Sequence, residues 1–337
     1  MKELDEIREK IKKSENPLIL FDDDPDGLCS YLLIRKFMGK GKGIAVRGEP
    51  FVDSKYVGRV KVYCPDLIII LDKPMIKDEF LDKMNAPIIW IDHHEPQNVK
   101  GVTYFNPRIK DDKDNRPVSY WCYRIVKENL WIAFVGIIAD YFLILEKSFR
   151  KEYPDLIKEK TKTIEEIYYG TKVGELIRIF SNILKGKMSD VNRNIELITK
   201  IKDPYELLDK KSDAGDELVR KHEKIQKDFD KLVKEATKNV KGNIIKFMYA
   251  DNKYSFSSEL SNYLSHKFPN KVILVCRDKG DKITCSIRSK KKSLPEIVNE
   301  SVEGLDGYGG GHQHACGACI SKEDFDEFYR RFEEKVK

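Results

Sequence analysis

The sequence has 337 residues, of which 35% are charged, and its 62 Lys and Arg exceed its 56 Asp and Glu for a net charge of +6. This length exceeds a typical single core, so we expect about two domains. The small basic excess permits a polyanionic ligand and mildly favours nucleic acid. A membrane span is excluded, because the most apolar stretch, 131–145, is only about 15 residues long and contains Asp140.

Strand-like and helix-like segments alternate through the first half of the chain. Buried strands are predicted at 17–21, 66–71 and 87–91. Helices are predicted at 27–38, 117–127 and 131–145. This alternation predicts an α/β fold with a doubly wound parallel sheet, in which functional side chains lie beyond the carboxyl ends of the strands.

The second half changes character twice. The segment 146–239 is almost wholly helical, and 216–238 reads as a solvated connecting helix. A smaller α/β unit follows, with strands at 243–249, 271–276 and 282–287, helices at 257–267 and from Lys322, and a glycine-rich turn between them. We therefore predict an N-terminal α/β domain with a helical extension at 1–200, a helical linker at 201–240 and a smaller C-terminal α/β domain at 241–337.

Three alternating aspartates, Asp22, Asp24 and Asp26, end the first predicted strand. Pro25 and Gly27 bend this segment, which lets the carboxylates converge on a cation. Three carboxylates at the end of an apolar strand are unfavourable unless a metal neutralises them. The alternative is a solvated acidic turn in which Asp26 caps the following helix.

The next two strands also end in candidate ligands. Asp72 follows the strand at 66–71, where an ordinary turn aspartate is the alternative. Asp92, His93 and His94 follow the strand at 87–91, and adjacent imidazoles beside a carboxylate can supply a ligand, an orienting group and a phosphate contact. Asp140, in an apolar segment, needs a partner that is either a metal or a local hydrogen bond.

Oxygen ligands mixed with imidazole suit a pair of divalent ions such as Mn²⁺ or Mg²⁺. In the C-terminal unit, the backbone of Gly309, Gly310 and Gly311 can approach an anion closely, and His312 adds a donor. A flexible loop is the alternative for the glycines. An alternative hypothesis for His312 is a zinc site formed with His314, Cys316 and Cys319, although these residues are more tightly spaced than usual zinc ligands.

The order and spacing of these motifs resemble the DHH phosphoesterase superfamily with its C-terminal DHH-associated domain, and the aspartate-rich first motif is most similar to the RecJ-like single-strand exonucleases, including short archaeal ones. This resemblance implies metal ligation by Asp24, Asp26, Asp72, His93 and Asp140, with Asp72 bridging two Mn²⁺ ions and Asp22 as an additional or outer ligand. Mg²⁺ is the alternative ion. Asp92 would orient an imidazole, and His94 and His312 would face the substrate.

The same resemblance assigns substrate binding to the C-terminal unit. Ser286 and Arg288 look like the family's phosphate-gripping segment, since a guanidinium forks onto phosphate oxygens. Lys290 and Lys291 continue from it and can follow the backbone of a longer strand, although a charge run is usually a solvated face. Gly309 to Gly311 and His312 would complete the grip on a terminal nucleotide, in a cleft between the domains.

We therefore expect a metal-dependent exonuclease that shortens single-stranded DNA or RNA to mononucleotides from the 3′ end, in DNA repair, replication or RNA turnover, with a helicase or other replication and repair proteins as partners. Two alternatives stay open. One is an oligoribonuclease, nucleotide phosphatase or cyclic-dinucleotide phosphodiesterase of the same superfamily. The other is a non-catalytic scaffold similar to the DHH-derived subunit of the eukaryotic replicative helicase.

The cysteines and the N-terminus bear on location. The seven cysteines are an odd number scattered through apolar runs, which predicts reduced, buried thiols. The first thirteen residues are charged and amphipathic and do not have the pattern of a secretory signal. We therefore expect a cytoplasmic protein without membrane association. The sequence leaves the oligomeric state open.

Overall fold

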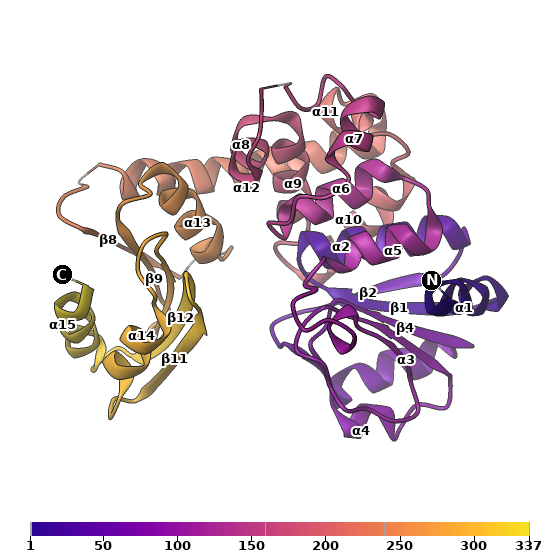
Figure 1. Cartoon of the computed structure of the whole chain (residues 1–337), viewed down its shortest axis with the longest axis horizontal. Coiled ribbons are helices and arrows are strands. Elements are labelled where there is room, and N and C mark those ends of the chain that lie inside the picture. The colour runs from indigo at the N-terminus through magenta and orange to yellow at the C-terminus, as the bar shows by residue number, and fades with distance from the viewer. Residues whose placement is uncertain (1, 159, 239, 252, 337) are drawn as a thin grey trace. The chain divides into compact units, whose positions relative to one another are not determined.

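The computed structural model describes residues 2–158, 160–238, 240–251 and 253–336. Asn239, which belongs to the predicted linker, lies outside the described residues. The chain divides into two compact units, Met1–His222 and Glu223–Lys337 (Figure 1). Among the described residues, no helix combines the length and apolarity needed to cross a membrane.

The N-terminal unit is built on a five-stranded parallel sheet of order β2-β1-β4-β6-β7. Its strands are β1 (Pro17–Asp22), β2 (Lys42–Val46), β4 (Leu67–Leu71), β6 (Ile88–Ile91) and β7 (Thr103–Phe105). The predicted parallel α/β fold is confirmed, although β2 and β7 were not predicted. A small second sheet pairs β3 (Phe51–Val52) with β5 (Met75–Ile76).

Helices cover both faces of this sheet, which is why its strands are apolar on both sides. In β4, Ile69 and Leu71 pack into one core and Ile68 and Ile70 into the other. Figure 1 shows that one group of helices covers one face of the sheet and that a second group covers the opposite face. The first group comprises α1 (Lys2–Lys13), α2 (Pro25–Met38), α5 (Val118–Val126) and α6 (Leu130–Ala139). The second comprises α3 (Val57–Tyr63) and α4 (Asp78–Leu81).

The helix predicted at 131–145 is wrong at its end, because α6 stops at Ala139. Tyr141 has a left-handed backbone conformation with φ of 55°, which a helix cannot continue through. Asp140 therefore lies at the helix terminus and not inside it, with its N–H bonded to the carbonyl of Gly136 at 3.0 Å. The apolar run hid this ending, since Phe142 to Leu145 continue to pack against the core from a loop.

The middle of the chain is helical, as predicted. Its helices are α7 (Glu146–Glu152), α8 (Ile164–Gly170), α9 (Lys172–Ile183), α10 (Met188–Lys200), α11 (Tyr205–Leu208) and α12 (Asp213–Ala236). Short 3₁₀ helices occur earlier, at Ser54–Tyr56 and Pro107–Ile109. The division between the two units falls within α12.

The C-terminal unit contains a mixed sheet of order β11-β12-β10-β9-β8, in which only β8 and β9 pair in parallel. Its strands are β8 (Ile244–Ala250), β9 (Val272–Asp278), β10 (Lys282–Arg288), β11 (Gly307–His312) and β12 (Ala315–Ser321). The helices α14 (Pro295–Val302) and α15 (Phe325–Val336) pack on one face, and α12 and α13 (Ser257–Lys267) on the other.

Two expectations for this unit are corrected. The glycine triplet is not a turn, because Gly309, Gly310 and Gly311 lie in β11 and pair with β12. A side chain at Gly309 would lie 2.6 Å from Val298, and one at Gly311 would lie 2.5 Å from the carbonyl oxygen of Ala315. These close approaches explain glycine in a strand. The terminal helix begins at Phe325 and not at Lys322, and α14 was not predicted.

Candidate functional site

The first motif converges at the carboxyl end of β1. Asp22 is the last residue of β1, and Asp24 caps α2 by accepting a hydrogen bond from the N–H of Gly27 at 2.8 Å. Asp26 follows in the first turn of the helix. A side chain at Gly27 would lie 2.4 Å from the carbonyl oxygen of Asp22, so only glycine permits so tight a turn. The turn brings the carboxylates together.

The neighbouring strands deliver the remaining groups to the same edge. Asp72 follows β4 in a left-handed conformation with φ of 59°, and its N–H bonds to Ile91 of β6 at 3.0 Å. Nε2 of His93 lies 3.4 Å from Oδ1 of Asp72, and Nδ1 lies 3.8 Å from Oδ2 of Asp140. The strand order changes direction beside β1 and β4, which is where ligands bind in open α/β sheets.

The side chains form overlapping groups that could each hold a metal ion, with ligand atoms within 4.8 Å of one another. The groups are Asp22, Asp24 and Asp72; Asp26, His93 and Asp140; and Asp72, His93 and His94. Asp72 and His93 each belong to more than one group. Oδ1 of Asp72 is buried, and within the described residues it has the ion-pair contact with His93 at 3.4 Å but no hydrogen bond of good geometry, so a cation could bind it. The donor set therefore fits divalent ions that accept carboxylate and imidazole.

Burial and mutual repulsion perturb these groups in the metal-free protein. Desolvation, together with the charge of Asp72, raises the pKa of Asp22 to about 6 and the pKa values of Asp24 and Asp26 well above their usual range. Burial likewise raises the pKa of Asp140 to about 6. Burial opposes ionisation of Asp72 too, but contact with His93 outweighs it and lowers the Asp72 pKa.

His93 shows the converse effect. Burial disfavours its charged form, yet Asp72, Asp140 and Asp26 outweigh the desolvation and raise the His93 pKa to about 11. In the metal-free protein a proton on His93 thus offsets part of the negative charge. A divalent ion would take over this compensation, since metal binding requires neutral imidazole and ionised carboxylates.

The acidic residues differ in what else holds them. Both oxygens of Asp26 accept hydrogen bonds from the start of α5, from the N–H of Val118 at 2.8 Å and of Ser119 at 3.1 Å. Asp22 accepts from Nζ of Lys73 at 2.8 Å, and that ammonium also donates to the carbonyl of Glu49 at 2.7 Å. Lys73 is only 2% exposed. Sequence analysis missed it, because nothing in the local sequence distinguishes a buried lysine beside a turn aspartate from a solvated one.

The second histidine is fixed through Asp92. Nδ1 of His94 lies 2.8 Å from Oδ1 of Asp92, and the backbone N–H of His94 donates to Oδ2 at 3.0 Å. Asn106, which was not singled out, donates to the carbonyl of His94 at 3.0 Å. The His94 side chain is 41% exposed while Asp92 is fully buried. Nε2 of His94 is therefore available to a ligand at this edge.

A second candidate region lies in the C-terminal unit. A cavity of about 500 Å³ is lined by many of the predicted substrate-binding residues. They are Ser286, Arg288, Gly310, Gly311 and His312. Further polar residues from α13, β9, β10 and the turn between β9 and β10 also line it and were missed: Ser257, Ser258, Arg277, Lys279 and Thr284. Ser257 begins α13, and a helix N-terminus favours anions.

Two predicted contacts in this pocket are engaged by the protein itself. Oγ of Ser286 lies 2.8 Å from Oγ of Ser261 in α13, so Ser286 joins the helix to the sheet. Nε of Arg288 donates to Oδ1 of Asn262 at 2.6 Å, and Nη1 donates to the carbonyl of Ile287 at 2.8 Å. Asn262 thus orients the guanidinium, a role that its sequence context does not reveal.

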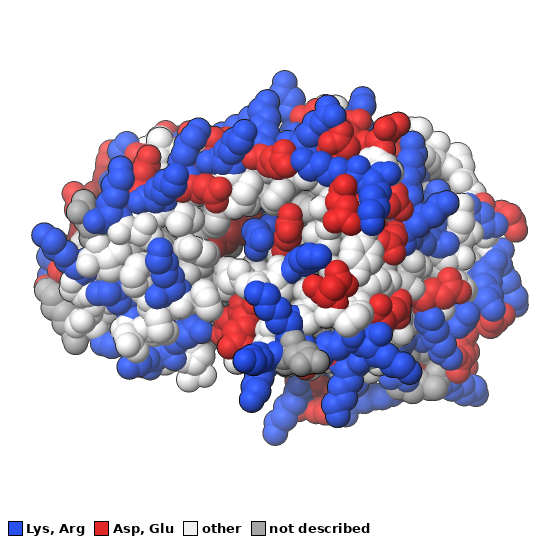
Figure 2. All heavy atoms as spheres, turned by 90° about the horizontal axis from the view of Figure 1, so that it is seen from above, with Lys and Arg blue, Asp and Glu red and all other residues white. Residues whose placement is uncertain are grey.

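The basic run beyond Arg288 is mixed in exposure. Lys290 and Lys291 are exposed, whereas Nζ of Lys292 donates to the carbonyl of Val336. Figure 2 shows Lys and Arg interspersed with Asp and Glu across the visible face, so that face carries no broad field of one sign. The zinc reading gains no support, since the groups able to hold a metal all lie in the N-terminal unit for the residues that the structure describes.

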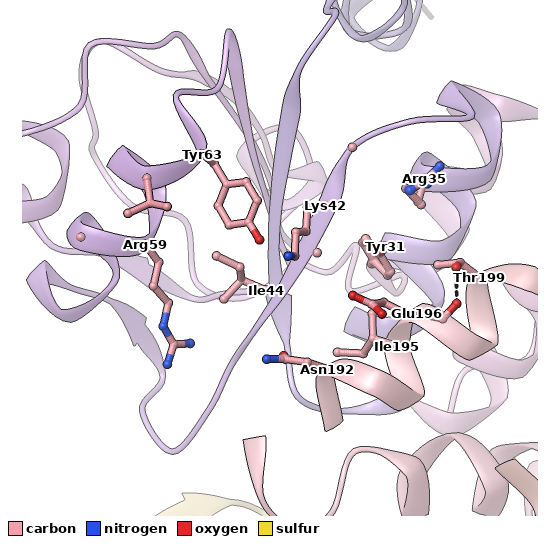
Figure 3. A pocket seen from close by; sticks show the side chains of 14 residues that line it. Tyr31, Arg35, Lys42, Ile44, Arg59, Tyr63, Asn192, Ile195, Glu196 and Thr199 are labelled. Atoms are coloured by element: carbon pink, nitrogen blue, oxygen red, sulfur yellow. Dashed lines mark hydrogen bonds between the residues drawn. The ribbon is translucent and has the colours of Figure 1, made fainter. Parts of the chain in front are cut away.

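Another cavity of about 500 Å³ lies beside the edge strand β2 (Figure 3). Its lining includes Tyr31, Lys42, Tyr63 and Glu196, and the ammonium of Lys42 lies 4.8 Å from the centre of the Tyr63 ring. Among its described lining residues, none belongs to the metal-ligand groups. This cavity is therefore separate from the candidate metal centre.

Comparisons with known proteins show which domain and which fold this chain resembles. Residues 243–337 match the model of the DHHA1 domain. Across the whole chain, RecJ from Thermus thermophilus, solved with Mn²⁺, superposes with a TM-score of 0.69 at 16% identity, covering 100% of this chain and 55% of RecJ. Residues 243–337 thus match a DHHA1 domain, and the whole chain has the fold of RecJ. The resemblance inferred from the sequence motifs is thereby confirmed.

Other solved structures are also similar to this chain. An exonuclease RecJ bound to manganese has a TM-score of 0.63 at 17% identity, with 99% of this chain and 93% of that chain covered. A pGpG-specific phosphodiesterase from Vibrio cholerae has a TM-score of 0.53 at 14% identity, covering 96% of this chain and 99% of that one. No curated protein sequence matches this chain. The chain spans 55% of the length of Thermus RecJ.

Proposed function

We propose that this DHH–DHHA1 protein is a metal-dependent exonuclease acting on single-stranded DNA or RNA. The observation that carries the proposal is the overlap of the ligand groups, in which Asp72 and His93 are shared and an oxygen of Asp72 is buried without a hydrogen bond. Two ions held there, Mn²⁺ or Mg²⁺, would supply an activated water and neutralise charge on a phosphate. The RecJ-like fold supports the same assignment.

The chain's own residues would divide the work. Asp24, Asp26, Asp72, His93 and Asp140 would bind the ions, with Asp72 between them. Asp22, fixed by Lys73, would act as an outer ligand. His94, held at Nδ1 by Asp92, would present Nε2 to the scissile phosphate and hold or donate a proton there.

The DHHA1 domain would hold the end of the strand. Arg288, oriented by Asn262, would fork onto phosphate oxygens, and His312 with the backbone of Gly309 to Gly311 would complete the contact. Exposed Lys290 and Lys291 would follow the backbone of a longer strand. Successive removal of nucleotides from the 3′ end would suit a role in DNA repair, replication or RNA turnover, with a helicase or other replication proteins as partners.

The test is a substrate panel with matched metal conditions. End-labelled single-stranded DNA and RNA, their duplexes, a linear dinucleotide and a cyclic dinucleotide are incubated with Mn²⁺, Mg²⁺ or EDTA. We expect stepwise shortening of single strands to mononucleotides, faster with Mn²⁺ than with Mg²⁺, and none in EDTA. Hydrolysis confined to dinucleotides would favour the small-substrate alternative, for which the pGpG phosphodiesterase fold is a precedent. Undiminished activity in EDTA would contradict the metal mechanism.

A further inference from the structure

The C-terminal unit carries a large aromatic side chain that its core does not use. Tyr308 lies on the edge strand β11 and is 72% exposed. Tyr308 is not one of the residues expected to bind substrate, and it does not line the pocket around Arg288. Single exposed aromatic residues are common on protein surfaces, so exposure alone decides nothing. The position of Tyr308 relative to that pocket is what matters.

Tyr308 points away from the helices α14 and α15. A side chain at the next residue, Gly309, would lie 2.6 Å from Val298 in α14, so this position of the strand faces the helix. Successive residues of a strand point to opposite faces of the sheet. The phenol ring of Tyr308 therefore projects from the opposite face.

The pocket lies on that same opposite face. Tyr308 pairs with Cys319 of β12, and Cys319 pairs with Thr284 of β10. Residues directly opposite each other on antiparallel strands point to one side of the sheet. Thr284 lines the pocket, as do Ser286 and Arg288 at two-residue spacing along β10. Tyr308 thus extends the pocket face to the edge of the sheet.

The separation along β11 indicates which part of a ligand would meet the ring. His312 lies four residues beyond Tyr308, or about 14 Å at the usual strand rise. That distance exceeds the reach from a phosphate to its own base. A nucleotide with its phosphate on Arg288 and His312 would therefore leave Tyr308 free for a base further along the strand.

We propose that Tyr308 is a base-stacking residue that binds a nucleobase beyond the nucleotide held by Arg288 and His312. The inference rests on the proposed nuclease function and specifies its substrate as an oligonucleotide. Stacking on an aromatic ring tolerates any base, because every base has a π face. Tyr308 therefore sets a preference for length and not for sequence. Its ligand is a single strand, since within a duplex the faces of a base are covered by the bases stacked above and below it.

Binding is measured with the whole 337-residue chain in EDTA, which prevents metal-dependent hydrolysis. The probes are a mononucleotide and a set of single-stranded oligonucleotides that carry 2-aminopurine at successive positions. Stacking quenches the fluorescence of 2-aminopurine. We expect Tyr308→Ala to weaken oligonucleotide binding about 5- to 150-fold and to abolish quenching at one position. Mononucleotide binding stays unchanged, and Tyr308→Phe behaves like the wild type.

Met248→Ala is the matched control. Met248 is 39% exposed on β8, the opposite edge strand, and it pairs with Cys276, whose side chain faces the core under α14 and α15. This variant should bind both probes normally. An abasic nucleotide at the quenched position should weaken wild-type binding as much as Tyr308→Ala does, and should weaken the variant no further.

Two results would overturn the inference: oligonucleotide binding by Tyr308→Ala equal to the wild type, or an equal loss for mononucleotides and oligonucleotides. A melting curve matching the wild type excludes unfolding of the variant. Hydrolysis with Mn²⁺ is scored separately. A chain that binds oligonucleotides through Tyr308 but cleaves no phosphodiester refutes the nuclease function alone, whereas hydrolysis with Tyr308-independent binding refutes the stacking role alone.

Discussion

The substitution Asp72→Asn tests the metal centre through stability, independently of any substrate. An ion present at 100 times its dissociation constant stabilises the folded state by about 2.7 kcal/mol. For a domain of the size of Met1–His222, each kcal/mol raises the melting temperature by about 2–4 °C. Each bound Mn²⁺ should therefore raise the melting temperature of the N-terminal unit by about 5–11 °C. Asp72 belongs to two of the ligand groups, so Asp72→Asn should remove most of this gain.

The assay is differential scanning calorimetry of the full chain with Mn²⁺ and with EDTA. The difference between the two conditions is compared for each variant, which cancels any effect of the substitution on the metal-free protein. Asp112→Asn is the control, because it removes the same charge from an exposed loop outside the ligand groups. A Mn²⁺ shift in Asp72→Asn equal to that of the wild type would refute the assignment of Asp72 as a shared ligand.

Three further predictions concern pH, anion binding and salt. The raised pKa values of Asp22 and Asp140, both about 6, give the metal-free protein stability that is present below pH 4 and lost as pH rises through 6; melting scans should show this fall in EDTA, and Mn²⁺ should reverse it by binding the ionised carboxylates. Arg288→Lys should raise KM for all substrates about 10-fold or more, since one charge-assisted bond of a fork is lost. Replacing Lys290 and Lys291 by Gln should flatten the slope of log affinity against log salt by about 1.4 for long single strands, and leave mononucleotide binding unchanged; an unchanged slope would show that the two lysines form an ordinary solvated face.

The sequence predicts the parallel sheet and the clustering of the candidate metal ligands at its edge, because both depend on local patterns. Apolar runs mark β1, β4 and β6. The first motif begins at the end of β1, Asp72 follows β4, and Asp92 follows β6. Carboxyl ends of parallel strands share one edge, so sequential neighbours of the strands become spatial neighbours. This rule places Asp72 and His93 at one edge, where Nε2 of His93 lies 3.4 Å from Oδ1 of Asp72.

What the sequence hides depends on long-range packing. The glycine triplet looks like a turn, and only its close approach to Val298 and to the backbone of β12 shows why it forms a strand. Lys73 looks solvated, yet the fold buries it between Asp22 and the carbonyl of Glu49. The alignment of Tyr308 with Thr284 follows from the register of β11, β12 and β10, which no local pattern specifies.

The most direct test of the metal centre is an anomalous difference map from crystals of the wild-type protein soaked in Mn²⁺. The account predicts two peaks at the carboxyl edge of the N-terminal sheet, with Asp72 contacting both. One peak should also contact Asp26, His93 and Asp140, and the other should contact Asp24. A map with no peak at this edge, or with a single ion that Asp72 does not touch, would contradict the two-ion site on which the proposed function depends.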